Sequence, residues 1–288
     1  MTGRVIKFYN SFFFVQVEKN LLPCKLRGLM KRDKKIGSAV CPGDFVEISA
    51  LADGTGVIEK VLPRVSLLNR PAVANVDRIV LTFAAASPDL NRLLLNKFLT
   101  LAEFSNLAEI VICVNKIDLA DDAENFLSDY ESLYKIIRTS TLTGAGISEL
   151  KKILSQGITV FAGPSGVGKS SLMNKIIPEL NLKVGKVSEK ILRGKHTTRI
   201  SELVEFGAGF IVDTPGFSAV DLADAGIDKK ILRSCFKEFS TFAQDCKFLN
   251  TCTHTHEPNC KVKTAVEEGK ILRERYESYL SMFKELEK

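Results

Sequence analysis

Residues 163–170 read Gly-Pro-Ser-Gly-Val-Gly-Lys-Ser and decide the fold. They match G-x-x-x-x-G-K-[S/T] at every defined position, which is the pattern of a loop that cradles nucleotide phosphates. The apolar run Ile158–Ala162 predicts a strand before the loop, and a helical pattern starts near Ser171 after it. In that context backbone N–H groups and the positive end of the helix would bind phosphate. An ordinary glycine-rich turn is the competing interpretation.

Two side chains at the end of this loop are expected to act on the phosphates. Lys169 would bridge the β- and γ-phosphates, so we expect it in catalysis as well as in binding, and Ser170 would ligate Mg²⁺. The residues predicted to bind the nucleotide here are Gly163, Pro164, Ser165, Gly166, Val167, Gly168, Lys169, Ser170 and Ser171.

A second phosphate-side motif, Asp213-Thr-Pro-Gly216, follows the apolar residues Phe210-Ile-Val. Asp213 would reach the Mg²⁺ shell through a water molecule, and the Gly216 N–H would bind the γ-phosphate. D-x-x-G alone is a weak pattern, but its place on an apolar strand downstream of a phosphate loop makes it specific.

The base is expected to be read upstream, by Asn115-Lys-Ile-Asp118 directly after the apolar strand Glu109–Val114. Asp118 can accept two hydrogen bonds from guanine N1–H and its exocyclic amine. Adenine offers no such donor pair and would leave the carboxylate unpaired, so the motif favours guanine. A solvated helix start capped by Asp118 is the competing interpretation. The residues expected at the base, the last two through main-chain N–H groups, are Asn115, Lys116, Asp118, Ser140 and Thr141.

The three motifs occur in the order base reader, phosphate loop, D-x-x-G, whereas in ordinary small GTPases the base reader comes last. Continuous apolar runs alternate with helical patterns, which predicts an α/β sheet with buried parallel strands. The apolar runs are 78–84, 109–114, 134–139 and 158–162, and the helical patterns are 90–104, 123–130 and 147–154. Because surface termini can be rejoined without moving a site, residues 71–222 are predicted to form a circularly permuted P-loop GTPase domain.

The regions on either side of this domain show different secondary-structure patterns in the sequence. Residues 1–70 hold five β-rich segments separated by turns, which predicts a small closed barrel such as an OB-fold. Within it, Lys31-Arg-Asp-Lys-Lys35 is a basic loop, either a solvated hairpin tip or a nucleic-acid contact. Residues 223–288 show helical spacing at 231–242 and 265–286, interrupted by a Cys- and His-rich stretch.

That stretch offers a set of metal ligands. Cys246, Cys252 and Cys260 stand with His254 in a short segment, and Cys₃His is a tetrahedral structural zinc set. His256 is a rival ligand, Cys235 a fallback, and chance clustering without metal the competing interpretation. The remaining cysteines, Cys24, Cys41 and Cys113, are interpreted as buried small residues.

Composition excludes several protein classes. The 288 residues are 45% hydrophobic and 26% charged, which excludes disordered and fibrous chains. The longest apolar stretch, Ile79–Ala86, falls far short of the about 20 residues that span a bilayer, and no secretory signal is visible, so a cytoplasmic protein is expected. Seven cysteines, an odd number, favour free or metal-bound thiols, and the net charge of +6 suits a polyanionic partner.

With a barrel in front and the Cys/His segment behind, the sequence resembles the ribosome small-subunit-dependent GTPase A family, also called RsgA or YjeQ. The resemblance covers essentially the whole chain. It implies GTP hydrolysis stimulated by the 30S subunit, a role in late small-subunit maturation, an OB-fold that touches 16S rRNA, and one structural zinc. A monomer without membrane contact is also expected. The motifs that carry the resemblance are Asn115–Asp118, Gly163–Ser170, Lys195–Arg199, Asp213–Gly216 and the Cys/His cluster.

The resemblance also bears on the metal ligands. The family pattern Cys-x-His matches Cys252-Thr-His254, which favours His254 over His256. The family usually separates the first two cysteines by four residues, whereas five lie between Cys246 and Cys252 here. This departure concerns the local turn more than the identity of the ligands.

The catalytic group is less evident. Phe217 stands after Gly216, where many GTPases carry the glutamine that orients water. In the predicted switch loop Gly194–Arg199, His196 is the candidate for orienting the attacking water or accepting its proton, with a surface histidine that contacts rRNA as the alternative. Thr197 or Thr198, with a slight preference for Thr198, would ligate Mg²⁺. Basic residues flank this loop and suit rRNA phosphates or plain solvation: Lys183, Lys186, Lys190, Arg193, Lys195 and Arg199.

The sequence therefore predicts a GTP-hydrolysing switch that binds GTP, GDP and the 30S subunit. The alternative is an rRNA-binding assembly module that binds guanine nucleotide with negligible hydrolysis, which Phe217 keeps open. Asn115 and Asp118 disfavour an ATPase with the same phosphate loop.

Overall fold

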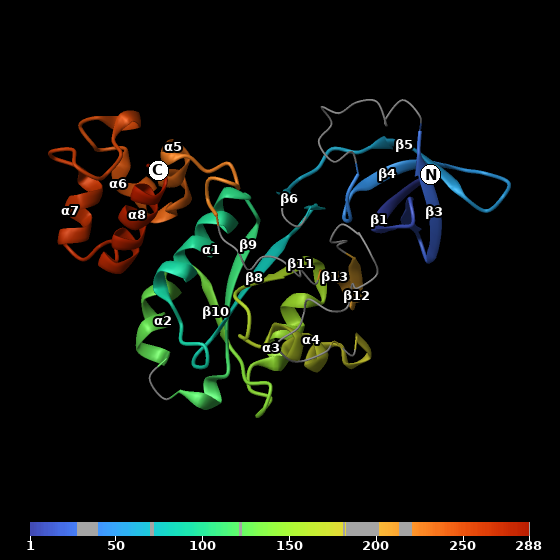
Figure 1. Cartoon of the computed structure of the whole chain (residues 1–288), viewed down its shortest axis with the longest axis horizontal. Coiled ribbons are helices and arrows are strands. Elements are labelled where there is room, and N and C mark those ends of the chain that lie inside the picture. Colours follow the sequence, from blue (N-terminus) through green and yellow to red (C-terminus); the bar gives the residue numbers. More distant parts are fainter. Residues whose placement is uncertain are drawn as a thin grey trace. The chain divides into compact units, whose positions relative to one another are not determined.

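The computed structural model describes residues 1–27, 40–69, 72–120, 123–180, 182, 202–212 and 221–287. Figure 1 labels the elements along the chain, and contacts group the chain into two units. The first unit comprises Met1–Val80, Ile147–Ala162 and Lys169–Phe217, and the second Leu81–Gly146, Gly163–Gly168 and Ser218–Lys288.

A closed five-stranded barrel forms the N-terminal part of the first unit, with the strand order β1-β2-β3-β5-β4. Apolar residues alternate along its strands and meet inside, among them Val5, Val15 and Ile58, which are fully buried. At the tip of the first hairpin, Asn10 and Ser11 both have positive φ, as a tight two-residue turn requires. The predicted barrel is therefore confirmed. Its strands are β1 (Thr2–Tyr9), β2 (Phe12–Val17), β3 (Asn20–Leu26), β4 (Phe45–Ala50) and β5 (Gly56–Val61).

A six-stranded sheet has the order β10-β9-β8-β11-β13-β12, and the two-stranded ribbon of β6 (Leu67–Asn69) and β7 (Ala72–Ala74) precedes it in the chain. The pairs β9–β10 and β11–β13 are parallel, while β12 pairs antiparallel with β13 across a turn at Gly207. The apolar runs of the sequence form these strands, as predicted, and β8 is buried from Ile79 to Ala84. The strands are β8 (Arg78–Ala84), β9 (Glu109–Asn115), β10 (Lys135–Arg138), β11 (Gln156–Ala162), β12 (Leu203–Phe206) and β13 (Ala208–Val212).

Helices connect the strands as the periodicity predicts. α1 starts at Asn91, whose side chain accepts a hydrogen bond from the Leu94 N–H, and its apolar face packs Phe98 edge-on against Phe83 of β8. The elements are α1 (Arg92–Phe104), α2 (Ala123–Glu131), α3 (Ile147–Leu154) and α4 (Lys169–Ile176), with short 3-10 helices at η1 (Ile117–Leu119) and η2 (Pro178–Leu180).

The C-terminal region is more broken than its periodicity predicts. The pattern at 265–286 predicts one helix, but the structure has two, because Gly269 adopts a left-handed φ of 72° and the N–H groups of Lys270 and Ile271 both turn back to the Ala265 carbonyl. The pattern at 231–242 is likewise split where Phe236 leaves the helical region. The elements here are α5 (Lys229–Leu232), η3 (Arg233–Cys235), η4 (Lys237–Phe239), α6 (Ser240–Ala243), η5 (Leu249–Thr251), α7 (Lys261–Glu267) and α8 (Arg273–Glu285).

Among the helices of the described ranges, none combines the length and the apolar character that crossing a membrane requires.

Candidate functional site

The phosphate loop lies between β11 and α4, as predicted, and its glycines are required by their surroundings. Gly163 has φ of 140°, and a Cβ atom there would stand 2.0 Å from the Thr82 carbonyl oxygen. Gly168 has φ of 93°, and a Cβ atom would stand 2.4 Å from Asn115 Nδ2. Both positions therefore exclude a side chain by contact as well as by backbone conformation.

The motif predicted to read the base is joined to the phosphate loop by hydrogen bonds within the second unit. The buried Asn115 donates from Nδ2 to the Val167 carbonyl at 2.9 Å. Lys116, whose φ is 61°, donates from Nζ to the Gly166 carbonyl at 2.8 Å and also to the Ser87 carbonyl. Two predicted motifs far apart in the sequence thus come together. The Ser87 carbonyl accepts a further hydrogen bond from Lys116.

Asp118 lies two residues further on, in η1, and is exposed. The neighbouring loop after β10 is held against the same strand end, because Thr139 donates from its N–H to the Val114 carbonyl and from Oγ1 to Asn115 Oδ1 at 3.2 Å. Ser140 follows and is buried, and its Oγ accepts from the Thr143 N–H at 3.1 Å. Because the Asp118 carboxylate is exposed and the loop after β10 is held in place, Asp118 can accept hydrogen bonds from the edge of a base.

The helix that follows the phosphate loop begins at Lys169, so Lys169, Ser170 and Ser171 form its first turn. The positive end of a helix stabilises an anion held by the preceding loop. Further along the helix, the Asn174 side chain both donates to the Leu182 carbonyl and accepts from the Leu182 N–H, each at 2.7 Å.

Several predicted site residues lie outside the described residues. They are His196, Thr197, Thr198, the flanking basic residues, Asp213, Gly216 and Phe217, and the basic loop 31–35. The described strand β13 ends at Val212, directly before Asp213. Glu202, which directly precedes β12, is the first described residue after the predicted switch region.

The Cys/His cluster is assembled in the second unit. Cys246, Cys252, His254 and Cys260 are all buried, and their ligand atoms lie within 4.8 Å of one another. Cys246 Sγ stands 3.8 Å from both Cys260 Sγ and His254 Nδ1, and His254 Nδ1 stands 3.3 Å from Cys260 Sγ. Burial raises the pKa of the Cys252 thiol to about 12 and lowers that of His254. A divalent cation is the partner that would ionise buried thiols in such a set, so the donors fit a metal site.

The alternative ligands are placed elsewhere. His256 is exposed and its Nδ1 contacts Thr255 Oγ1 at 2.9 Å. Cys235 is buried away from the cluster and contacts the Ile231 carbonyl through its Sγ at 3.5 Å. Cys24, Cys41 and Cys113 are buried, as expected of small core residues.

Sequence reasoning missed the residues that hold the cluster loop. Glu257 is 8% exposed and accepts hydrogen bonds from the Thr253 N–H and Oγ1 and from the Thr255 N–H. Burial alone would raise the pKa of Glu257, but these hydrogen bonds lower it to about 2. From α8, Tyr276 Oη donates to the His254 carbonyl at 2.7 Å. In the sequence, the only indication of this role is that Glu257 is an acidic residue between the ligands His254 and Cys260.

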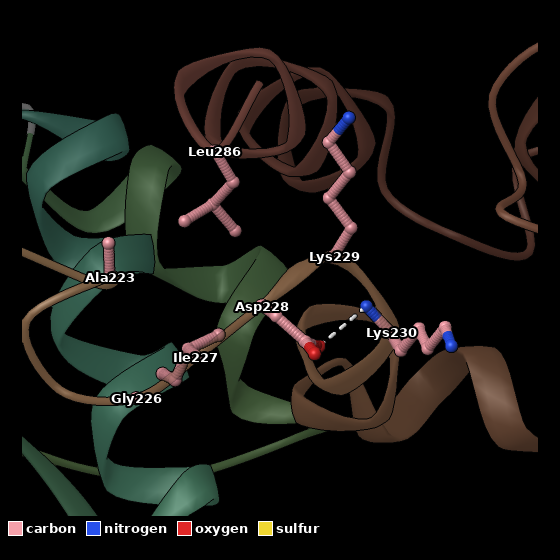
Figure 2. Close-up of a pocket in the computed structure, with 7 residues that line it drawn as sticks. All are labelled: Ala223, Gly226, Ile227, Asp228, Lys229, Lys230 and Leu286. Atoms are coloured by element: carbon pink, nitrogen blue, oxygen red, sulfur yellow. Dashed lines mark hydrogen bonds between the residues drawn. The ribbon is translucent and has the colours of Figure 1, made fainter. Parts of the chain in front are cut away.

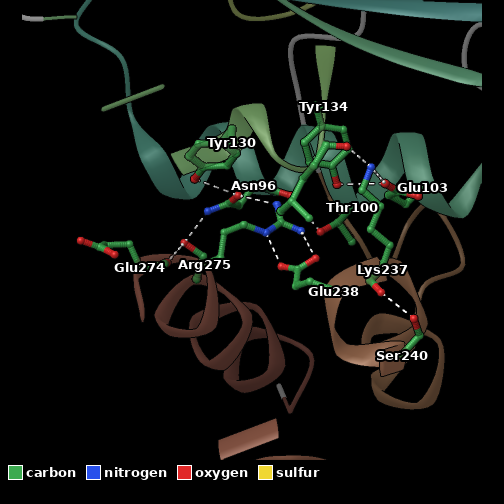
Figure 3. Close-up of polar contacts among 12 residues, drawn as sticks. Asn96, Thr100, Glu103, Tyr130, Tyr134, Lys237, Glu238, Ser240, Glu274 and Arg275 are labelled. Atoms are coloured by element: carbon green, nitrogen blue, oxygen red, sulfur yellow. Dashed lines mark hydrogen bonds and ion pairs between the residues drawn. The ribbon is translucent and has the colours of Figure 1, made fainter. Parts of the chain in front are cut away.

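A buried polar network joins the cluster region to α1 within the second unit (Figure 3). Arg275 of α8 donates from Nε to Glu238 Oε1 at 2.5 Å and from Nη2 to Oε2 at 3.1 Å. It also donates from Nη1 to Asn96 Oδ1 at 3.0 Å, and Tyr130 Oη donates to the same oxygen. Asn96 completes the network by donating to Ser278 Oγ. The network was not foreseen from the sequence.

A cavity of about 510 Å³ lies beside the segment that follows residue 220 (Figure 2). Two of its three charged side chains already have partners, because Asp228 caps α5 through the N–H groups of Lys230 and Ile231, and Lys229 pairs with Glu287 at 3.1 Å. We therefore assign no ligand to it. Its lining residues are Ala223, Gly226, Ile227, Asp228, Lys229, Lys230 and Leu286.

Comparison with known proteins connects these features. Residues 61–223 match the family described as RsgA GTPase, and residues 2–58 match the RsgA N-terminal domain. The chain belongs to the RsgA GTPase family. It is 42% identical, over 99% of its own length and 95% of the other's, to the small ribosomal subunit biogenesis GTPase RsgA of Caldanaerobacter subterraneus subsp. tengcongensis, and 44% identical (99% and 97%) to that of Clostridium botulinum strain Eklund 17B.

Solved structures of the RsgA family agree in fold. The crystal structure of YjeQ from Thermotoga maritima superposes with a TM-score of 0.84 at 39% identity, covering 99% of this chain and 98% of that one. YloQ, described as a circularly permuted GTPase, superposes with a TM-score of 0.80 at 31% identity, covering 99% and 94%. The circular permutation inferred from motif order is thereby confirmed.

Proposed function

We propose that this protein hydrolyses GTP on the small ribosomal subunit during late maturation, and that the 30S subunit stimulates turnover. The observation that carries the proposal is the attachment of Asn115 and Lys116 to the phosphate loop through the Val167 and Gly166 carbonyls. This arrangement supports one nucleotide bound between the guanine-reading motif and the phosphate loop. The relatives named above are themselves small ribosomal subunit biogenesis GTPases.

The roles of individual residues follow from this proposal. Asp118 binds guanine, Lys169 contacts the β- and γ-phosphates, and Ser170 and Thr198 hold Mg²⁺. Asp213 and Gly216 contact the metal shell and the γ-phosphate, and His196 orients the attacking water. The remaining nucleotide contacts are those of Ser140, Thr141 and the rest of the phosphate loop.

The metal of the Cys₃His cluster is proposed to be zinc. With zinc–sulfur bonds of about 2.3 Å, tetrahedral geometry places two ligand sulfurs about 3.8 Å apart. Cys246 Sγ and Cys260 Sγ are separated by 3.8 Å, and all four donors are buried protein atoms. With four protein ligands the ion is structural and leaves no position for a reacting water.

Each of the three regions has a separate role in this proposal. Residues 1–70 contact 16S rRNA, residues 71–222 bind and hydrolyse GTP, and residues 223–288 carry the zinc. The protein acts as a monomer, in the cytoplasm where its subunit partner is assembled.

Two measurements test the function. GTP turnover is compared with and without purified 30S subunits, and a clear stimulation is expected; turnover that stays negligible in both would favour the rRNA-binding module instead. In the second, Asp118→Asn is expected to weaken GTP binding and to favour xanthosine nucleotides, because the amide matches the altered base edge. An unchanged guanine preference would remove Asp118 from the base site.

A further inference from the structure

Strand β1 of the barrel contacts the edge strand β12 of the sheet, and both strands belong to the first unit. An isolated antiparallel bridge joins Lys7 to Glu202, and Lys7 Nζ pairs with Glu202 Oε1 at 2.7 Å. One strand over, Gln16 of β2 donates from Nε2 to Glu205 Oε1 at 2.5 Å. Two polar side chains of the barrel thus hold two carboxylates, Glu205 in the edge strand β12 and Glu202 directly before it.

Arg4 adds a contact to the neighbouring strand β13. Its guanidinium carbon lies 4.4 Å from the ring centre of Phe45 on β4 and 5.2 Å from that of Phe210 on β13. Its Nε is buried and has no hydrogen-bond partner among the described residues, so the two rings supply much of its environment. The pKa of Arg4 is lowered by burial, which Asp77 partly offsets. We define the joint as Arg4, Lys7 and Gln16 on the barrel with Glu202, Glu205 and Phe210 on the sheet.

The barrel is also fixed to the chain that leads into the sheet. Asp44 is fully buried and pairs with both Nε and Nη2 of Arg64, at 2.7 and 2.8 Å. Asn75 donates to the Gly43 carbonyl and accepts from the Val65 N–H, each at 2.9 Å. These bonds fix the segment between the barrel and β8, so the barrel has a second attachment besides its contacts with Glu202, Glu205 and Phe210.

Strands β12 and β13 are flanked in the sequence by the residues proposed to act on the γ-phosphate. His196 and Thr198 precede β12 in the sequence, and Glu202 is the first described residue after them. The chain leaves β13 at Val212, whose next residue is Asp213. Both strands are therefore linked along the chain to residues proposed to act on the γ-phosphate.

We infer that the joint transmits the contact between barrel and small subunit to the GTP-hydrolysing residues, and so makes turnover depend on the subunit. The inference rests on the proposed function and adds the route of its regulation. The joint consists of partly exposed contacts, 31% and 52% exposed for the side chains of Lys7 and Glu202, which are individually weak and can rearrange. Several such contacts together suit the about 5- to 150-fold effects typical of coupling between two sites.

A charge exchange across the joint tests this inference. Lys7→Glu and Glu202→Lys each place like charges together, and the double variant restores an opposite pair in reversed order. Gln16→Glu, of nearly the same shape, repels Glu205 and serves as a second probe. The control is Arg27→Glu, which breaks the 2.6 Å pair with Glu59 on β5 inside the barrel and leaves the joint intact. GTP turnover is measured with and without 30S subunits, and subunit binding by co-sedimentation.

For Lys7→Glu, Glu202→Lys and Gln16→Glu we expect turnover without subunits to stay within about twofold of wild type and stimulated turnover to fall at least about fivefold. The charge-exchanged double variant and the Arg27→Glu control are expected to retain stimulation. Full stimulation in Glu202→Lys and Gln16→Glu would overturn the inference, as would loss of stimulation that the double variant fails to rescue. A wild-type protein that 30S does not stimulate would instead overturn the proposed function, so the two failures are distinguishable.

Discussion

Breaking the buried ion pair between Arg275 and Glu238 is expected to destabilise the second unit strongly. The Arg275 side chain is 1% exposed and that of Glu238 9%, and two hydrogen bonds join them. Arg275→Met would leave the Glu238 carboxylate buried without its cation and Asn96 Oδ1 without one donor. Removing one partner of a buried pair costs about 3–5 kcal/mol. At about 2–4 °C per kcal/mol for a protein of this size class, the melting temperature should fall by roughly 6–20 °C.

Intrinsic tyrosine fluorescence reports this transition selectively. The chain has no tryptophan and five tyrosines, four of which, Tyr130, Tyr134, Tyr276 and Tyr279, belong to the second unit. Tyr130 and Tyr134 surround the Arg275 guanidinium, with ring centres 5.9 and 5.7 Å away. Thermal melts of wild type and variants followed by this signal therefore measure the unit that contains the ion pair.

Two variants make the argument refutable. Lys270→Met breaks a pair of similar length, 2.6 Å to Glu268, but with side chains 60% and 49% exposed, so it should cost less than about 1 kcal/mol. The double variant Arg275→Met/Glu238→Leu replaces both charges by apolar groups and should recover most of the loss. The reasoning is refuted if Arg275→Met shifts the melt no more than Lys270→Met, or if the double variant is no more stable than the single one.

Three further perturbations probe the two sites. Gly163→Ala should abolish binding of a fluorescent guanine nucleotide, because the added Cβ would stand 2.0 Å from the Thr82 carbonyl; retained affinity would contradict the assigned loop geometry. Removing the metal with a chelator should lower the melting temperature of wild type but hardly that of Cys260→Ser, in which a ligand is already missing. Equal decreases in the melting temperature of the two proteins would argue against a metal on the Cys260 thiol. Glu257→Gln should cost about 1–3 kcal/mol at neutral pH by weakening the hydrogen bonds of the cluster loop. Because the pKa of Glu257 is lowered from 4.5 to about 2, its carboxylate stabilises the fold above about pH 4.5 and this contribution is lost as pH falls toward 2. The melting-temperature difference between wild type and this variant should shrink over the same range, and a difference independent of pH would show that charge is not involved.

The nucleotide motifs and the sheet could be predicted because their residues obey local rules. The glycines of the phosphate loop need positive φ at Gly163 and Gly168, and the apolar runs are strands buried on both faces. The cluster ligands lie close together in sequence, so their spacing alone indicates a metal site.

Contacts between residues distant in sequence could not be predicted in this way. Arg275 is 37 positions from Glu238 and 179 from Asn96, and nothing local marks the three as partners. The same holds for Gln16 and Glu205, 189 positions apart. The helix predicted over 265–286 failed for the opposite reason, because its apolar spacing continues through Gly269 while the backbone there turns left-handed.

Circular permutation determines where additional domains can act on the nucleotide. In this chain order the GTPase region ends shortly after Asp213–Gly216, so the Cys/His region follows directly after the motif proposed to contact the γ-phosphate. From residue 221 onward that continuation is anchored, since Leu222 and Ile227 are buried and Asp228 caps α5. The Arg275 network then fixes α8 to α1, whose strand neighbour β9 ends at Asn115. In the sequence, the D-x-x-G motif therefore stands between two anchored parts of the chain, β13, which ends at Val212, and the packed region that begins at residue 221.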